Sequence, residues 1–174
     1  MKLVQLEDSA SLIYDDVASP VGRLRLIGSN DALIAIWFEH GRDGARNVSA
    51  LVKGTSAVLV RARHQLEEYF AGMRRTFDLP LAPRGTPFQQ RVWARLQCIE
   101  YGATLSYGAL ATALGNPKAS RAVGLANGSN PIPIVIPCHR VIGANGSLTG
   151  FGGGLPIKSA LLTLERAERQ PQLL

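Results

Sequence analysis

Short apolar segments separated by turn residues fill the first half of the chain. Residues 11–17, 23–28 and 33–38 form such segments, and Leu24-Arg25-Leu26 alternates apolar and polar side chains. Alternation with a period of two is typical of a strand with one buried face. Residues 56–70 then repeat apolar side chains at helical spacing. This half therefore predicts a small antiparallel sheet covered by one helix.

Helical periodicity dominates the second half. Thr86-Pro87 is a typical helix start, and apolar side chains follow it on one face. Residues 106–114 and 118–127 predict two short helices joined by the turn Gly115-Asn116-Pro117. Such a pair matches the helix-turn-helix pattern, in which the second helix contacts DNA. Residues 157–168 have a further helical pattern.

The prolines and the glycine of Pro80-Leu81-Ala82-Pro83-Arg84-Gly85 interrupt both patterns. We therefore predict an α/β (α+β) protein with a sheet domain over residues 1–82 and a mainly helical domain over residues 83–174. No apolar stretch reaches the roughly 18 residues of a membrane span, and Met1 is not followed by a signal-peptide core. The expectation is a cytoplasmic protein without a membrane partner.

Basic residues are concentrated in the second half. The net charge is +6, and the part of the chain from Thr86 onward has 8 Lys and Arg against 3 Asp and Glu. Such an asymmetry favours a nucleic-acid partner. A solvated surface without a partner is the alternative.

Chemistry is expected at Pro137-Cys138-His139-Arg140, which follows the apolar run 132–136. We predict this run to be a buried strand and the tetrapeptide a turn that leaves the sheet. A cysteine beside a base and a cation is a candidate nucleophile, although an inert buried cysteine would fit these residues too. Cys98 and Cys138 are too few for a disulfide scaffold or a zinc site. Neither a metal nor a cofactor is expected.

The second helix of the predicted pair has few side chains that can read base edges. Residues 119–126 contain one cation, Arg121, among mostly small side chains. Small residues let a helix approach closely, as a narrow minor groove requires, and an arginine can fill the gap left by an extruded base. Helix packing would explain the alanines equally well, and Arg121 would then be a phosphate contact or a surface residue.

Several linked segments of the second half carry a resemblance to a known family. They are Thr86-Pro87-Phe88-Gln89, Ser106-Tyr107-Gly108, Gly115-Asn116-Pro117-Lys118-Ala119, Arg121-Ala122-Val123-Gly124, Asn127-Gly128-Ser129-Asn130-Pro131, Pro137-Cys138-His139-Arg140-Val141-Ile142 and residues 158–165. In this order the chain resembles O6-alkylguanine-DNA alkyltransferases. The resemblance implies a DNA-repair protein that flips an alkylated guanine out of the duplex and moves the alkyl group irreversibly from O6 to Cys138. Such a methylated-DNA–protein-cysteine methyltransferase acts once.

The resemblance also implies the catalytic residues. Cys138 is the acceptor, His139 takes its proton through a water, and Glu165 orients the imidazole. Neighbouring side chains diverge, which favours a relay, and an acid partner fixes the histidine tautomer. We expect the relay to keep Cys138 partly as thiolate. Replacing His139 or Glu165 should slow transfer and leave DNA binding largely intact.

The remaining implied roles concern DNA and the base pocket. Tyr107 would contact the flipped base and its 3′ phosphate, Arg121 would fill the vacated stack, and Asn130 would brace the turn between helix and nucleophile. The carbonyls of Cys138 and Val141 would accept from the guanine amine. The implied DNA-binding residues are Tyr107, Ser120, Arg121, Ala122 and Gly124, and the implied pocket residues are Tyr107, Val141, Phe151 and Gly152, whose N–H would donate to O6.

The chain departs from the family at several positions, and two other classes of protein stay open. Phe151 stands where the family often has tyrosine, and Gly152 where it has serine or alanine, so a roomier pocket is expected. A catalytically silent lesion-binding alkyltransferase-like protein would lack the acceptor cysteine. A helix-turn-helix transcription factor would leave Cys138 without a role. The implied partner is alkylated duplex DNA, bound through the minor groove by a monomer, with cooperativity on DNA and activity on O4-alkylthymine left open.

Overall fold

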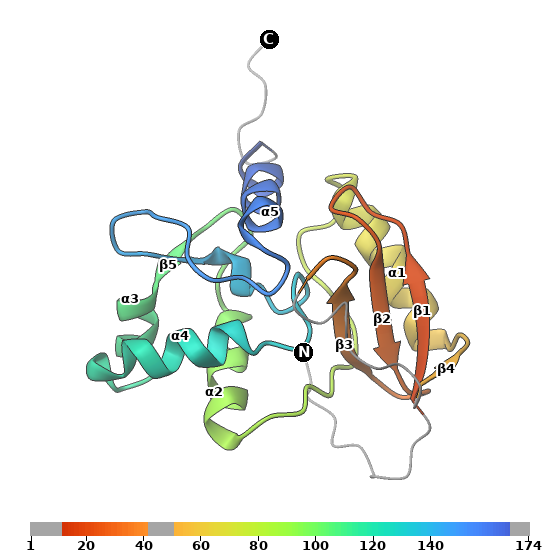
Figure 1. The fold of residues 1–174 in the computed structure, drawn as a ribbon, viewed down its shortest axis with the longest axis horizontal. Helices are drawn as coiled ribbons and strands as arrows, with labels where there is room; N and C mark the ends of the chain where they lie inside the picture. Colours follow the sequence, from red (N-terminus) through yellow and green to blue (C-terminus); the bar gives the residue numbers. More distant parts are fainter. Residues whose placement is uncertain (1–11, 42–50, 168–174) are drawn as a thin grey trace. The chain divides into compact units, whose positions relative to one another are not determined.

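The computed structural model describes residues 12–41 and 51–167. The chain divides into two compact units between Arg84 and Gly85, just after the boundary expected from the sequence. Figure 1 shows a sheet with a helix in the first unit and mainly helices in the second. The predicted α/β (α+β) fold class is therefore confirmed.

A four-stranded sheet in the order β3-β2-β1-β4 forms the N-terminal unit. β1 (Ile13–Val17), β2 (Leu24–Gly28) and β3 (Leu33–Phe38) pair antiparallel, and β4 (Val52–Lys53) pairs parallel with β1. The first three strands confirm the prediction, apart from residue 11, which lies outside the described residues. β4 was not predicted, because two residues are too few to show a periodic pattern.

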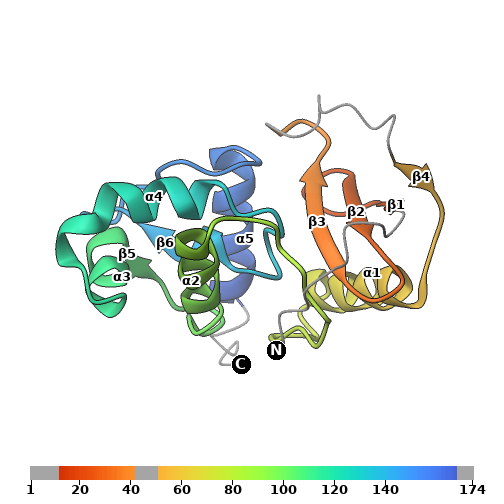
Figure 2. The ribbon, with the colours of Figure 1, turned by 90° about the horizontal axis from the view of Figure 1, so that it is seen from below.

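One helix, α1 (Ala57–Phe70), covers one face of this sheet (Figure 2). The helix begins where the hydroxyl of Ser56 accepts from the N–H of Leu59 (3.3 Å). Leu59 and Leu66 on the helix and Leu26 on β2 are almost completely buried. Each buried leucine of this kind contributes about 1.5–3 kcal/mol. The helical stripe and the alternating strand together make the core of this unit.

Four helices and a two-stranded parallel sheet form the described part of the C-terminal unit. They are α2 (Pro87–Leu96), β5 (Leu105–Ser106), α3 (Tyr107–Ala113), α4 (Ser120–Gly128), β6 (Val141–Ile142) and α5 (Leu155–Ala167), with the 3₁₀ turns η1 (Pro117–Ala119) and η2 (Cys138–Arg140). Thr86 and Gln89 form a capping box at the start of α2. α4 packs against both α2 and α3. The predicted helices are confirmed, and α3 and α4 form the helix-turn-helix pair.

The apolar segment 132–136 is a buried turn, so the predicted strand is wrong. The N–H of Ile136 donates to the carbonyl of Ile132 (2.9 Å), and Pro133 has no N–H to donate to a sheet. Ile134 has a φ of 73°, which is rare for a β-branched side chain and costs about 1–3 kcal/mol. The prediction failed because a fully buried turn and a fully buried strand both produce an unbroken apolar run.

Candidate active site

Cys138 begins η2 directly after the buried turn, and 4% of the residue is exposed. The side chain of Asn130 holds this turn, because its Nδ2 donates to the carbonyl of Ile136 (2.8 Å) and its Oδ1 accepts from the N–H of Ile132 (3.0 Å). Nδ2 of Asn127 donates to the carbonyl of Cys138 (3.4 Å). Asn127 lies in α4 and Asn130 just beyond it, so both amides connect this helix to the cysteine.

His139, Arg140 and Glu165 form a buried network beside Cys138. Nε2 of His139 lies 2.8 Å from Oε1 of Glu165. Arg140 donates from Nη2 to Oε1 and from Nε to Oε2, both at 2.9 Å. Oε2 of Glu165 also accepts from the N–H of Gly102 (3.0 Å), and Nη1 of Arg140 donates to the carbonyl of Ile99 (2.6 Å). One carboxylate therefore orients the imidazole and neutralises a buried guanidinium group.

The network determines which nitrogen of His139 is basic. Burial raises the pKa of Glu165, but the hydrogen bonds and charges of His139 and Arg140 outweigh this and bring it to about 2. An ionised carboxylate only accepts, so Nε2 of His139 carries the proton and Nδ1 is the basic atom. Nδ1 is buried without a hydrogen bond to any described protein atom. Burial lowers the pKa of His139 despite Glu165, so the imidazole is neutral at pH 7.

Lys158 brings a buried ammonium group to the same site. The residue is 0% exposed, and its Nζ donates to the carbonyls of Val141 (2.6 Å) and Thr149 (2.7 Å). These bonds connect β6 to the loop that precedes α5. Burial lowers the pKa of Lys158, and Cys138 opposes that shift. The lysine therefore acts both as a loop contact and as a positive charge near the thiol.

Cys138 is a neutral thiol in this environment. Burial raises its pKa to about 11, and the hydrogen bond of Asn130 and the charge of Lys158 only partly oppose this rise. The expectation that the relay keeps the residue partly as thiolate is therefore wrong. The sequence pattern shows the neighbouring base and cation, but desolvation depends on the folded surroundings.

A cavity of about 440 Å³ brings several of the sequence-predicted DNA residues together. It opens between α3, α4 and the loop after β6, and is lined by Tyr107, Ser120, Arg121, Gly124, Gly128, Thr149 and Gly150. Gly124 lies close to the ring of Tyr107, because a Cβ at this position would be in van der Waals contact with it, at 3.7 Å. Arg121 is exposed at the rim. The cavity has the aromatic wall, the small helix residues and the cation that were expected of a base-binding site.

Other predicted residues lie elsewhere. Ala122 is exposed on the adjacent face of α4, and Val141 is buried with its carbonyl bound by Lys158. Phe151 and Gly152 are partly buried in the loop before α5 and are not among the residues that line the cavity. Thr149 and Gly150 form that wall instead. Sequence analysis expected the glycine-rich loop that begins at Gly150 to form this wall but did not single out Thr149, because a loop has no periodicity that shows which residue faces inward.

A long part of the chain contributes no carboxylate to the surface around this cavity. The sequence contains no Asp or Glu between Glu100 and Glu165, and Glu165 is completely buried. Lys118 and Arg121 are exposed in the same stretch. The helix-turn-helix face therefore suits an anionic partner.

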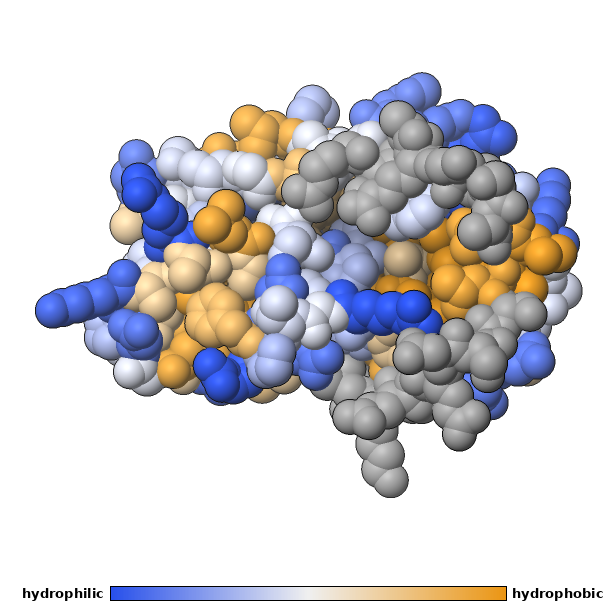
Figure 3. All heavy atoms as spheres, turned by 60° about the horizontal axis from the view of Figure 1, so that its bottom comes forward, coloured by the Kyte–Doolittle hydropathy of each residue, from blue (hydrophilic) through white to orange (hydrophobic). Residues whose placement is uncertain are grey.

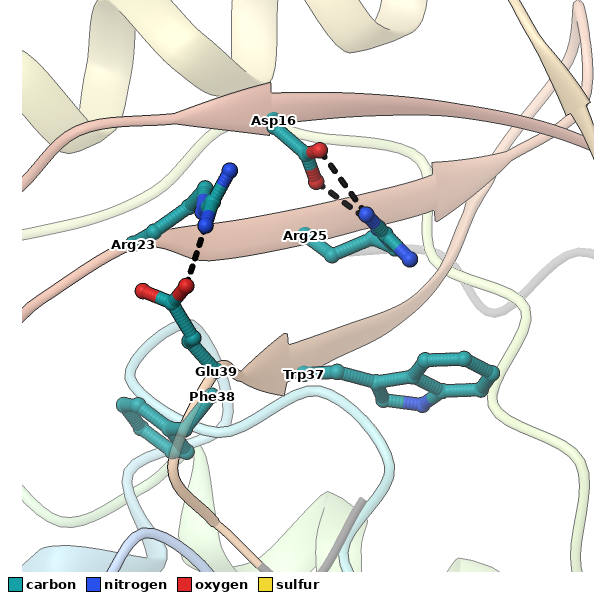
Figure 4. Close-up of a pocket in the computed structure, with 6 residues that line it drawn as sticks. All are labelled: Asp16, Arg23, Arg25, Trp37, Phe38 and Glu39. Carbon is teal, nitrogen blue, oxygen red and sulfur yellow. Dashed lines mark hydrogen bonds and ion pairs between the residues drawn. The ribbon is translucent and has the colours of Figure 1, made fainter. Parts of the chain in front are cut away.

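A second cavity, of about 180 Å³, lies on the N-terminal sheet. Its lining residues are Asp16, Arg23, Arg25, Trp37, Phe38 and Glu39 (Figure 4). Arg25 contacts both carboxylate oxygens of Asp16 (2.7 and 2.8 Å) and lies over the ring of Tyr14. Arg23 pairs with Glu39. Both guanidinium groups already have carboxylate partners, so this cavity is not a candidate anion site.

Two other expectations concern metals and membranes. Within residues 12–41 and 51–167, no group of His, Cys, Asp and Glu is arranged to hold a metal ion. No helix among the described residues is long and apolar enough to cross a membrane. Cys98 and Cys138 are both free thiols, the first exposed and the second buried.

Sequence analysis used Arg140 only as the cation beside Cys138, and gave no role to Lys158 or Asn127. A signal for Lys158 was present in α5, where positions 158, 161, 162 and 165 form one buried face. Charged residues in an apolar helical stripe are uncommon unless they are paired. This pattern would have indicated that Lys158 and Glu165 both belong to the site.

Comparison with known proteins covers both units. Residues 12–83 match the model of the 6-O-methylguanine DNA methyltransferase ribonuclease-like domain, and residues 87–167 match that of the DNA binding domain. A methylated-DNA–protein-cysteine methyltransferase of Methanosarcina acetivorans is 49% identical over 154 residues, covering 88% of this chain and 98% of its own. The constitutive enzyme of Bacillus subtilis is 45% identical over 156 residues, covering 88% and 94%.

A solved structure agrees with these matches. Mycobacterium tuberculosis OGT in complex with DNA is 46% identical, with a TM-score of 0.83 over 90% of this chain and 94% of that one. Both units are thus shared with proteins of one kind. The chain belongs to the 6-O-methylguanine DNA methyltransferase family.

Proposed function

We propose that the protein repairs DNA by moving the alkyl group of O6-alkylguanine irreversibly to Cys138. The observations that carry this proposal are the buried His139–Glu165–Arg140 network beside Cys138, and the bond from Lys158, whose charge acts on the thiol, to Thr149, which lines the cavity on the helix-turn-helix. Relatives of high identity are named methylated-DNA–protein-cysteine methyltransferases. The protein would therefore be a single-turnover enzyme of DNA repair.

The transfer joins Sγ of Cys138 to the alkyl carbon while the bond from that carbon to O6 breaks. The thiol proton passes through one water to Nδ1 of His139, and the bond from O6 leaves its electron pair on the guanine. The imidazolium then returns one proton through water to this guanine anion, which regains its 6-oxo form with a proton on N1 while His139 becomes neutral again. A thioether is stable in water, so Cys138 stays alkylated and the molecule acts once. Glu165 takes no proton itself, and its charge stabilises the imidazolium that forms.

The pKa values of the free protein make ionisation of the Cys138 thiol a costly part of the reaction. The pKa of Cys138 is about 11 and that of His139 is lowered, so proton transfer between them is uphill in the free protein. Formation of the thiolate therefore adds to the barrier for transfer. Lys158 and the amide of Asn130 stabilise negative charge that develops on sulfur.

The proposed partner is duplex DNA that contains the alkylated guanine. α4 would enter the minor groove, with Tyr107 against the extruded base and Arg121 in the gap that the base leaves. The absence of carboxylates between Glu100 and Glu165 supports this orientation. A relative was crystallised with DNA. We infer that one monomer acts on one lesion. We also infer a reducing compartment such as the cytoplasm, because the thiol of Cys138 must stay reduced in order to react.

The direct test is mass spectrometry after incubation with duplex DNA containing O6-methylguanine. We expect the protein to gain one methyl group, located on Cys138 by peptide mapping, and then to stop reacting. Cys138→Ser should abolish the transfer, and Cys98→Ser should not. Repeated turnover with an unmodified Cys138 would contradict the mechanism. A protein that binds the lesion without gaining mass would be the silent binder or the transcription factor.

Arg121 should act on DNA and not on the sulfur chemistry. Extrusion of a base costs a few kcal/mol, and a side chain in the gap offsets part of this. We expect Arg121→Ala to slow transfer from duplex about tenfold or more, and to leave alkylation by free O6-benzylguanine nearly unchanged. Rates measured with the two substrates decide this. Equal slowing on both would mean that Arg121 maintains the cavity instead.

A further inference from the structure

Leu125 is the exception among the residues of α4. The helix otherwise presents small side chains and Arg121, yet Leu125 is a large apolar residue and is 72% exposed. Apolar side chains also lie among polar ones on the C-terminal unit, at the left of Figure 3. Isolated exposed leucines are common, so exposure alone indicates nothing. The position of this leucine relative to the cavity is the informative observation.

Arg121 divides the accessible surface of α4 into two sides. Successive helix residues project about 100° apart, so Gly124 and Gly128 point to one side of Arg121 and Ala122 and Leu125 to the other. The glycines line the cavity, whereas Ala122 and Leu125 are exposed. Leu125 projects about 40° from Arg121 and about 6 Å further along the axis. It is thus the bulky side chain next to Arg121 on the side away from the cavity.

This geometry has a consequence for bound DNA, and the inference that follows rests on the proposed function. A base extruded into the cavity lies on the glycine side of Arg121, which fills its place in the stack. The duplex that remains stacked must then lie along the other side. We propose that Leu125 contacts the minor groove of this duplex, against the apolar edges of the deoxyriboses beside the gap. Apolar side chains at such positions are known to hold kinked or opened base steps.

The proposal commits to DNA as the occupant of this face. Arg121 is exposed next to Leu125 on α4, Lys118 is exposed in η1 just before this helix, and the stretch from 101 to 164 has no acidic residue. These charges suit a phosphate backbone. The contact is also continuous with the cavity proposed to take the base. Self-association through Leu125 is the competing explanation, and it becomes an outcome of the test.

The experiment compares Leu125→Ala with the parent protein on two substrates. We expect Leu125→Ala to weaken binding to a lesion-free duplex, and to slow transfer from an O6-methylguanine duplex, by about tenfold. Alkylation by free O6-benzylguanine should change less than about twofold, because the reacting groups are untouched. The slope of log affinity against log salt should stay unchanged, whereas Arg121→Ala should reduce it by about one. Leu125→Met, which keeps an apolar side chain, should retain most of the affinity.

Met73→Ala is the matched control, since Met73 is 76% exposed in the N-terminal unit. It should leave binding and both rates unchanged. Parent-like duplex binding by Leu125→Ala would overturn the inference, as would equal slowing on duplex and free base, or a change confined to self-association. A parent protein that transfers no alkyl group would instead overturn the proposed function. The affinity of Leu125→Ala for the lesion-free duplex would then still decide whether Leu125 contacts DNA.

Discussion

Glu165→Ala is expected to destabilise the C-terminal unit by about 3–5 kcal/mol and to abolish transfer, because it leaves the buried guanidinium of Arg140 without its carboxylate. It also removes the partner of Gly102 and of His139. His139→Ala deletes only the base, so it should keep the fold and slow transfer about 10²- to 10⁴-fold. The structure therefore predicts different effects for Glu165→Ala and His139→Ala, whereas the sequence predicted the same effect for both.

Thermal or urea unfolding, DNA affinity and the transfer rate should be measured on both variants. Glu165→Ala should lose DNA affinity together with stability, in contrast to the expectation from the sequence that binding stays intact. Glu100→Ala is the control, because Glu100 is an exposed carboxylate of the same unit. A Glu165→Ala protein as stable as the Glu100→Ala protein would show that the buried network does not hold the unit together.

The same network should determine stability in acid. The pKa of Glu165 is about 2 in the folded protein, below the 4.5 of an ordinary glutamate. A depressed pKa stabilises the fold above about pH 4.5, and this stabilisation is lost as the pH falls toward 2. Unfolding free energies measured across that window should therefore decrease more steeply for the parent than for Glu165→Gln.

Lys158→Met should slow transfer about tenfold or more at neutral pH, since the positive charge of Lys158 lowers the pKa of Cys138. Removing that charge raises the cost of forming the thiolate. Transfer rates with free O6-benzylguanine should therefore rise with pH for both proteins, with the rise displaced to higher pH in Lys158→Met. Because free O6-benzylguanine is the substrate, changes in DNA binding do not affect these rates.

Lys118→Met is the matched control, because Lys118 is an exposed lysine of the same unit. Its pH profile with the free base should equal that of the parent. Lys158 also connects Val141 and Thr149, so loosening of the loop must be separated from the electrostatic effect. Weaker binding of the free base with an unshifted pH profile would assign Lys158 to the loop alone.

Local signals account for the elements that the sequence predicted correctly. Thr86 and Gln89 form a capping box with Pro87 at the first helical position, all within one helical turn, and alternation through Leu24-Arg25-Leu26 defines β2 without distant contacts. The turn 132–136 depends on a different kind of information. Its conformation is held by the amide of Asn130, and a left-handed Ile134 follows from no local preference. Such a segment is determined by what surrounds it.

The residues of the candidate site likewise include some that the local sequence shows and others that only the fold brings together. Cys138, His139 and Arg140 are adjacent in sequence, so their chemistry could be recognised together. Arg140 pairs with Glu165, 25 residues away, and only the fold shows that contact. The resemblance supplied Glu165 as the partner of His139, yet it did not indicate that one carboxylate serves both residues. The raised pKa of Cys138 likewise depends on burial and is invisible to residue spacing.

The stretch without acidic residues between Glu100 and Glu165 has a consequence for how lesions are found. Phosphates repeat at the same spacing along every duplex. A surface of cations and small side chains therefore binds each position along the duplex with nearly the same free energy. A carboxylate on that surface would make some positions repulsive and slow movement between them. Because this stretch contributes none, the protein should slide and hop along undamaged DNA until a weakened base pair opens, over distances that shorten as salt rises. A molecule that reacts only once can then scan many base pairs before it is spent.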